Sequence, residues 1–337
     1  MMGCTQKKAS LTSGRKIQEM NMMRKNIKQL LAALIVGSAA VLSGIHPASS
    51  QTAPDPSGAS ANGDGVKVSY LGPAGTYTEE AALLFFPESE LMLPKATVDE
   101  AIAELSAGNV DYAVIPQENS LGGAVTNYID ALIKADETYV AGEIILPISQ
   151  TLMGIPGASL EDITTVYSHA QGIAQSAEWR KIHLPDAAAQ EMPSTAAAAS
   201  YVAEAGDITL AAVAAPGAAK LYGLTVLAEN VQISDTNKTR FYVLSSSAPE
   251  DEARSHAVFI ASCEASRIDD IIIEIHDSGL ELVTLHDRPE GSRLGTYNYI
   301  IEVEDEEGID AENIDKIDSI SGVRFLGSFD VVEKQAF

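Results

Sequence analysis

The sequence predicts an α/β protein followed by a smaller C-terminal domain of ferredoxin-like βαββαβ order. Between Val66 and Leu244, short apolar stretches alternate with segments of helical length, which is typical of an α/β layer with largely parallel strands. Beyond a polar, proline-containing stretch at 245–251, the order becomes strand, helix, strand, strand, helix, strand. Hydrophobic residues make up 46% of the chain, enough to build a sizeable core and to exclude global disorder.

The individual elements follow from apolar periodicity and from the turn residues between segments. In the α/β region we expect strands at 66–71, 90–94, 112–115, 164–167, 209–213 and 240–244. Helices are expected there at 76–86, 98–107, 124–135, 170–180, 195–205 and 216–221. In the smaller domain the strands are expected at 257–262, 280–287, 297–303 and 323–332, and the helices at 267–276 and 311–320.

A large excess of acidic residues limits the partners of the chain. The formal net charge is −25, and because the first fifty residues carry a net charge of +6, the remainder carries −31. Such a surface repels phosphate backbones and anionic lipid, so we expect no nucleic-acid partner. An anionic substrate would need local cations or N–H donors. The two cysteines, Cys4 and Cys263, cannot form a disulfide framework or a zinc site of the usual spacing.

The N-terminus has the order of a secretory signal. A basic stretch at 24–28 precedes an apolar run at 30–42, and small residues follow at 48–50. This order is typical of an export signal, and the apolar run is too short to span a bilayer comfortably. We expect residues 1–50 to be an export segment and residues 51–65 a flexible linker, so that the mature protein is periplasmic or secreted. The alternative is an uncleaved N-terminal membrane anchor.

Two polar segments lie at predicted junctions between a strand and a helix, where α/β proteins place ligands. In Leu71-Gly-Pro-Ala-Gly-Thr-Tyr-Thr78, Gly75 and Thr76 would offer N–H groups and the positive end of a helix to an anion. In the Ser-His-Ala-Gln segment, His169 is a residue type that handles protons and Gln171 lies beside it. Either junction could instead be purely structural.

The other two polar segments carry more side-chain chemistry. Glu118, Asn119 and Ser120 cluster in a Pro-Gln-Glu-Asn-Ser turn, where they could bind carboxylate and hydroxyl groups or simply cap a helix. In the Thr-Arg-Phe tripeptide, Thr239 precedes Arg240, whose planar guanidinium matches a carboxylate. The alternative for Arg240 is a surface position on an edge strand.

Together the four segments resemble the prephenate dehydratase family. Its pattern of Gly-Pro-x-Gly-Thr, Pro-x-Glu-Asn-Ser, Ser-His-x-Gln and Thr-Arg-Phe is present in order, supported by Ser-Thr-Ala-Ala from residue 194. The resemblance implies a two-lobed catalytic domain like that of periplasmic binding proteins over 66–248, with the substrate between the lobes. It also implies an ACT-like domain over 255–333, an enzyme that needs no cofactor, and assembly into a homodimer or higher homo-oligomer.

The resemblance also assigns roles to the site residues. Thr239 is implied as the essential catalytic residue, and we add His169 and Asn119 as catalytic candidates. The expected substrate-binding residues are Gly75, Thr76, Glu118, Ser120, Gln171, Ser194, Thr195, Arg240 and Phe241. The expected reaction is the decarboxylating dehydration of prephenate to phenylpyruvate. Arogenate as substrate, or solute binding without catalysis, remain alternatives.

The C-terminal segment departs from the family at both of its effector motifs. Arg288 and Pro289 match the end of a Glu-Ser-Arg-Pro segment, but His286 and Asp287 replace its first two residues. A Gly-Ala-Leu segment is replaced by residues that include the bulky Arg267. We therefore expect phenylalanine to be at most a weak effector, with Arg288 and Pro289 as the remaining regulatory candidates.

Overall fold

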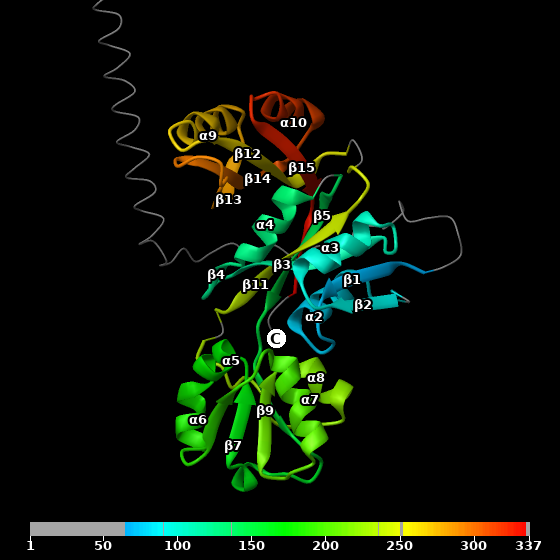
Figure 1. The fold of residues 1–337 in the computed structure, drawn as a ribbon, viewed down its shortest axis with the longest axis vertical. Helices are drawn as coiled ribbons and strands as arrows, with labels where there is room; N and C mark the ends of the chain where they lie inside the picture. The colour runs from blue at the N-terminus through cyan, green and yellow to red at the C-terminus, as the bar shows by residue number, and fades with distance from the viewer. Residues whose placement is uncertain (1–64, 90, 136, 235, 250–251, 335–337) are drawn as a thin grey trace, which may run out of the picture. The chain divides into compact units, whose positions relative to one another are not determined.

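The computed structural model describes residues 65–334 except 90, 136, 235, 250 and 251. In this part of the chain, helices pack against β-sheets that belong to two lobes of an α/β region and to a C-terminal domain (Figure 1). The predicted export segment lies outside the described residues, and so does the predicted linker apart from residue 65. No helix in the described part is both long enough and apolar enough to span a bilayer.

The first lobe is a mixed sheet of order β16-β5-β11-β3-β1-β2, with β4 beside β3. Its strands are β1 (Lys67–Leu71), β2 (Leu91–Lys95), β3 (Tyr112–Asn119), β4 (Gly123–Ala124), β5 (Tyr139–Pro147), β11 (Lys238–Ser245) and β16 (Val331–Glu333). Its helices are α2 (Tyr77–Phe85), α3 (Val98–Ser106) and α4 (Thr126–Lys134). Helix α2 packs on the sheet face that carries Tyr70 and Phe241, and α3 and α4 pack on the face that carries Ile115 and Tyr242.

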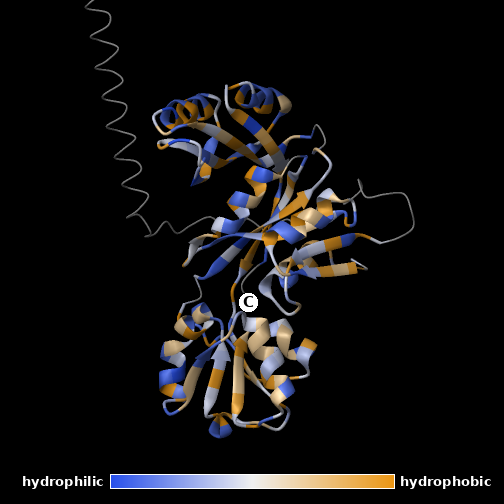
Figure 2. Ribbon diagram, in the orientation of Figure 1, coloured by the Kyte–Doolittle hydropathy of each residue, from blue (hydrophilic) through white to orange (hydrophobic). Residues whose placement is uncertain are grey.

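The second lobe has strand order β10-β6-β9-β7-β8. Its strands are β6 (Thr151–Gly154), β7 (Thr165–Ser168), β8 (Ala188–Glu191), β9 (Leu210–Ala214) and β10 (Thr225–Ala228). Its helices are the 3₁₀ turn η1 (Leu160–Asp162), α5 (Ala170–Gln175), α6 (Ala177–His183), α7 (Thr195–Ala205) and α8 (Pro216–Tyr222). Helices α7 and α8 cover one face and α6 the other (Figure 1), and the central strand β9 is apolar along its length (Figure 2).

The chain crosses between the lobes at 148–150 and again at 229–237. The two-lobed α/β fold is therefore confirmed, but the expectation of largely parallel strands is wrong. Strand β11 runs antiparallel to both β3 and β5. It returns from the second lobe and starts beside the ends of these strands, so Thr239 pairs with Asn119 and Lys238 with Pro147.

The C-terminal domain has the predicted βαββαβ order. It consists of β12 (Arg254–Glu264), α9 (Ile268–Asp277), β13 (Glu281–Pro289), β14 (Thr296–Ile309), α10 (Ala311–Asp318) and β15 (Val323–Phe329). The strands form an antiparallel sheet of order β13-β14-β12-β15. The single strand expected at 323–332 is wrong, because β16 leaves this sheet and pairs parallel with β5 of the first lobe.

The C-terminal sheet is buried on both faces. Helices α9 and α10 cover one face (Figure 1), whereas Val258, Ile260 and Ile300 on the other face share a core with the first lobe. At Gly327 of β15, an added Cβ would lie 2.1 Å from the carbonyl oxygen of Val140. Only glycine allows the two backbones to approach so closely, and this approach fixes the domain against β5.

Candidate active site

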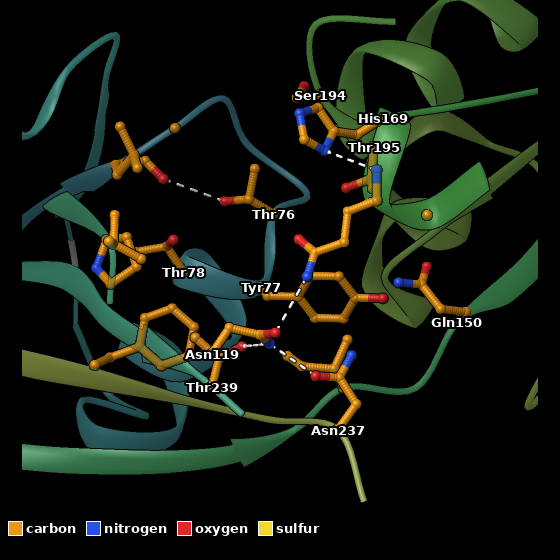
Figure 3. A pocket seen from close by; sticks show the side chains of 18 of the residues that line it. Thr76, Tyr77, Thr78, Asn119, Gln150, His169, Ser194, Thr195, Asn237 and Thr239 are labelled. Carbon is orange, nitrogen blue, oxygen red and sulfur yellow. Dashed lines mark hydrogen bonds between the residues drawn. The ribbon is translucent and has the colours of Figure 1, made fainter. Parts of the chain in front are cut away.

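A cleft of about 430 Å³ lies between the two lobes, beside the paired ends of β3 and β11. Figure 3 shows Asn119, Thr239 and Asn237 on one side of it, with His169 and Ser194 on the other. The predicted site residues that line the cleft are Thr76, Asn119, His169, Gln171, Ser194, Thr195, Thr239 and Phe241. Residues more than 160 positions apart in the sequence therefore meet in one cavity.

Three helices begin at this cleft. Thr76 caps α2, His169 caps α5 and Ser194 caps α7, each by accepting a backbone N–H with its side chain. The first-turn N–H groups of a helix lack acceptors within the helix, and its N-terminus carries partial positive charge. The lining of the cleft in the described structure therefore includes helix starts with N–H donors, but it contains no lysine, arginine or carboxylate.

Asn119 organises the polar network on the first lobe. Its Nδ2 donates to Thr239 Oγ1 at 2.9 Å and to Asn237 Oδ1 at 2.7 Å. Its Oδ1 accepts the backbone N–H groups of Leu121 and Gly122 and, from the second lobe, Nε2 of Gln171 at 3.1 Å. Because the oxygen of Thr239 is engaged as an acceptor, its O–H hydrogen can be donated into the cleft.

His169 occupies the opposite wall. Its Nδ1 accepts the N–H of Gln171 at 3.4 Å, so the neutral ring carries its proton on Nε2. It makes no direct contact with Thr239 or Asn119 among the described hydrogen bonds. Any proton that moves between His169 and Thr239 must therefore pass through the substrate or water.

Four of the predicted substrate-binding residues do not line the cleft. The N–H of Gly75 donates to Oε2 of Glu79 at 2.6 Å, within the lobe. Ser120 is hydrogen-bonded to the neighbouring strand β11, because its Oγ accepts the backbone N–H of Lys238. Glu118 and Arg240 form a cross-strand pair directed toward the C-terminal domain.

Arg240 points away from the cleft because side chains alternate along a strand. Asn237, Thr239 and Phe241 face the cleft, so Arg240 between them must face the other side. There its guanidinium forms ion pairs with Glu143 of β5 and Glu302 of β14, and both carboxylates are fully buried. Arg240 thus connects the first lobe to the C-terminal domain and lies outside the cleft in which it was expected to bind a substrate carboxylate.

The buried ion pairs shift the pKa values of their members. Burial, followed by the charge of Glu302, raises the pKa of Glu143 to about 8, although Arg240 opposes this change. Burial disfavours the charged form of Arg240, but the hydrogen bond that it donates to Glu143 and the charges of both carboxylates raise its pKa overall. The single positive charge of Arg240 therefore faces two carboxyl groups. A proton on Glu143 removes the second negative charge.

Several lining residues received no role from the sequence. They are Tyr77, Thr78, Gln150, Gln175 and Asn237. The two-residue period of a strand could have identified Asn237, because it lies two residues before Thr239 and therefore on the same face. Gln150 lies in a crossing segment, where no periodicity signals a site. Burial, followed by the charge of Glu80, raises the pKa of Tyr77, whose hydroxyl donates to the carbonyl of Ser149.

The two regulatory candidates lie at the end of β13. Arg288 forms a bidentate pair with Asp130 of α4, with Nε and Nη2 at 2.6 and 2.7 Å from the carboxylate oxygens. Pro289 is the last residue of the strand. His286, which departs from the family motif, lies 2.5 Å from the hydroxyl of Tyr128 on the same helix. These side chains therefore serve the contact with the first lobe.

Comparison with known proteins agrees with this geometry. The family model described as prephenate dehydratase matches residues 68–249. The prephenate dehydratase of Lactococcus lactis subsp. lactis is 30% identical over 276 residues, which cover 79% of this chain and 98% of that protein. The bifunctional chorismate mutase/prephenate dehydratase of Stutzerimonas stutzeri is 33% identical over 239 residues. The match covers 70% of this chain but only 65% of the bifunctional protein's length.

Solved structures show the same similarity. Prephenate dehydratase from Arthrobacter aurescens, in complex with L-Phe, has a TM-score of 0.70 and 31% identity over 79% of this chain and 90% of that chain. GqqA, described as a novel type of quorum quenching acylase, has a TM-score of 0.69 and 25% identity over 78% of this chain and 97% of that chain.

The raised pKa of Glu143 predicts how stability varies with pH. The folded protein keeps a proton on Glu143 that the unfolded chain releases above its ordinary pKa of 4.5. The free energy of unfolding should therefore fall as pH rises from about 4.5 through about 8. Glu143→Gln, which mimics the protonated carboxyl, should flatten this dependence. Urea unfolding at a series of pH values measures it.

Glu264→Gln is the matched control, because Glu264 forms an exposed ion pair with Arg293 and should leave the wild-type pH profile unchanged. A Glu143→Gln variant with the full wild-type pH dependence would show that another group is responsible.

Proposed function

The chain belongs to the prephenate dehydratase family, and from this premise we propose that its cleft converts prephenate into phenylpyruvate, carbon dioxide and water. The observation that carries the proposal is the alignment of the Thr239 hydroxyl. Asn119 donates to its oxygen, so its hydrogen can be donated into the cleft at which three helices begin. In this reaction the ring carboxylate leaves as CO₂, and its electron pair aromatises the ring and expels the hydroxyl opposite. One proton is consumed, since the hydroxyl departs as water.

Thr239 is placed to assist the departing hydroxyl. Asn119 donates to its oxygen, so the hydroxyl hydrogen of Thr239 is directed at the substrate. A threonine hydroxyl is a weak acid, so a proton that it passes on must be replaced from another donor. His169 is the imidazole of the lining on the opposite wall, and its protonated ring supplies that proton through water or the substrate.

The helix N-termini hold the substrate anion. Backbone N–H groups at the start of a helix bind carboxylates without a formal counter-charge, which suits a lining that contains neither lysine nor arginine in the described structure. Apolar side chains such as Pro116, Val125 and Phe241 complete the lining. A weakly solvated environment favours loss of a carboxylate as neutral CO₂.

The same lining favours prephenate over arogenate. The two molecules differ at the side chain, where arogenate carries an ammonium group in place of the ketone of prephenate. A buried ammonium needs a carboxylate partner, and the cleft lining of the described residues provides none. A keto acid therefore fits the site better than an amino acid.

Acylase activity, which is the activity named for GqqA, is not favoured by this geometry. A threonine nucleophile requires a base that accepts its proton. The partner of Thr239 is the amide Nδ2 of Asn119, which is a donor and cannot act as a base. Solute binding without catalysis would not require this alignment of a hydroxyl.

The deciding experiment measures phenylpyruvate formation from prephenate, with arogenate as a second substrate. Wild-type protein should turn over prephenate faster than arogenate. Thr239→Ala should lower kcat by about 10²–10⁴-fold without a large loss of thermal stability, and Thr239→Ser should retain most of the activity because it keeps the hydroxyl. Wild-type kcat in Thr239→Ala would contradict the role of Thr239, and absence of turnover by the wild type would contradict the proposed function.

We further propose that the C-terminal domain is an ACT-like domain in which phenylalanine is at most a weak effector, and that it supports a homodimer or higher oligomer. Arg288 is already paired with Asp130, and Arg267 stands directly before α9, where a small residue would leave more room for a ligand. Phenylalanine should therefore inhibit weakly in the prephenate assay. Inhibition at low micromolar phenylalanine, about 1–10 μM on the usual affinity scale, would refute this.

We also propose that the protein is exported and processed near residue 50, on the support of the basic, apolar and small residues in order at the N-terminus. The first strand of the described structure, β1, begins at Lys67, well beyond this point in the sequence. A peptidase could therefore cut the chain without disturbing the fold. N-terminal sequencing of protein from its native host should find a start close to residue 50, and an intact N-terminus on cytoplasmic protein would overturn export.

A further inference from the structure

Asn237 is a buried cleft residue with one half of its amide unpaired. Its side chain is only 2% exposed and lies in the lining of the cleft. Its Oδ1 accepts a hydrogen bond from Asn119 Nδ2 at 2.7 Å. Its Nδ2 has no hydrogen-bond partner among the described residues.

The orientation of this amide is determined by the backbone. The oxygen of Asn119 accepts the N–H groups of Leu121 and Gly122 at 3.1 and 2.9 Å. Backbone N–H groups can only donate, so Asn119 must turn its oxygen toward them and its nitrogen toward Asn237. Asn237 must then turn its own oxygen toward Asn119. The Nδ2 group of Asn237 therefore points away from Asn119, and its N–H donors have no acceptor among the described residues.

The position of Asn237 in the cleft limits which partners can reach its Nδ2. Asn237, Thr239 and Phe241 alternate along β11 and all line the cleft. Asn119 Nδ2 binds both Asn237 Oδ1 and Thr239 Oγ1, so the unpaired N–H group lies near the hydroxyl assigned to the reaction. A buried donor left without an acceptor is costly, and a bound molecule in the cleft removes that cost.

We propose that Asn237 is a substrate-binding residue whose Nδ2 donates a hydrogen bond to a carboxylate oxygen of the bound substrate. The inference rests on the proposed function. An N–H donor and an acceptor-only carboxylate are matched chemically. In the described lining, which lacks lysine and arginine, neutral donors of this kind must share the anion with the helix N-termini.

Asn237→Asp removes the donor while it keeps the oxygen that Asn119 binds. Aspartate keeps an oxygen for Asn119, so Thr239 stays aligned, but it replaces the N–H group with a second oxygen that repels a carboxylate. KM for prephenate should rise about ten- to hundredfold, as expected for loss of a hydrogen bond to a charged group. The change in kcat should be much smaller, because the contact exists in both the bound substrate and the transition state.

Asn230→Asp is the matched control. Asn230 is exposed and lies outside the cleft lining, and its Oδ1 accepts a hydrogen bond from Ser149, which aspartate retains. This variant introduces the same charge into the same crossing segment and should keep wild-type KM. An equal rise in KM in both variants would mean that added charge, and not the lost donor, weakens binding, which would overturn the proposal.

Calorimetric titration with phenylpyruvate separates this inference from the proposed function. It should show the same loss of affinity in Asn237→Asp even if the wild type does not turn over prephenate. Unchanged KM and unchanged phenylpyruvate affinity would overturn the role of Asn237 while the dehydratase activity stands. If Asn237→Asp does not fold, Asn237→Ala removes the donor without a buried charge and should raise KM and also lower kcat, because Asn119 loses a partner. A folded Asn237→Ala variant with wild-type KM and affinity would likewise overturn the role.

Discussion

The buried contact of Arg240 with Glu143 and Glu302 is the interaction on which the arrangement of the site depends. It places one charged side chain of β11 between the first lobe and the C-terminal domain. A charge can be buried there because carboxylates from β5 and β14 surround it, and removal of Arg240 would leave buried acidic groups without a counter-charge. Glu302 is held further by Tyr242 at 2.6 Å and Gln117 at 3.1 Å. Strand β11 is therefore fixed in rotation about its own axis.

This fixed rotation of β11 determines which of its side chains line the cleft. Since side chains alternate along a strand, holding Arg240 on one face commits its neighbours Thr239 and Phe241 to the other. The antiparallel pairing of Thr239 with Asn119 then brings a hydroxyl against an amide donor. The C-terminal domain thus contributes to the site without touching it, through the face of β11 that the substrate never meets.

The sequence predicted the order of most elements and the starts of the three helices at the cleft to within one residue, because apolar periodicity is a local property. It did not predict that β11 would enter antiparallel or that β16 would return to the first lobe, since both depend on where the chain goes after leaving a lobe. The motif around Thr239 indicated the region correctly, but it could not separate Thr239 from Arg240. The alternation of side chains along β11 separates the two: once Thr239 faces the cleft, Arg240 must face the interface with the C-terminal domain.

Under the proposed function, the cleft lining is the means by which a strongly acidic chain holds a dianion. A lysine or arginine in the lining would attract both carboxylates of prephenate, including the one that must leave as uncharged CO₂, and would stabilise the bound substrate against reaction. Helix N-termini and neutral amides act over a shorter range and in fixed directions. They can hold one carboxylate at a defined place and leave the other among apolar side chains. The one arginine of the Thr-Arg-Phe motif is kept out of the cleft by its buried carboxylates, so the same ion pairs that fix β11 also keep a strong cation away from the reacting group.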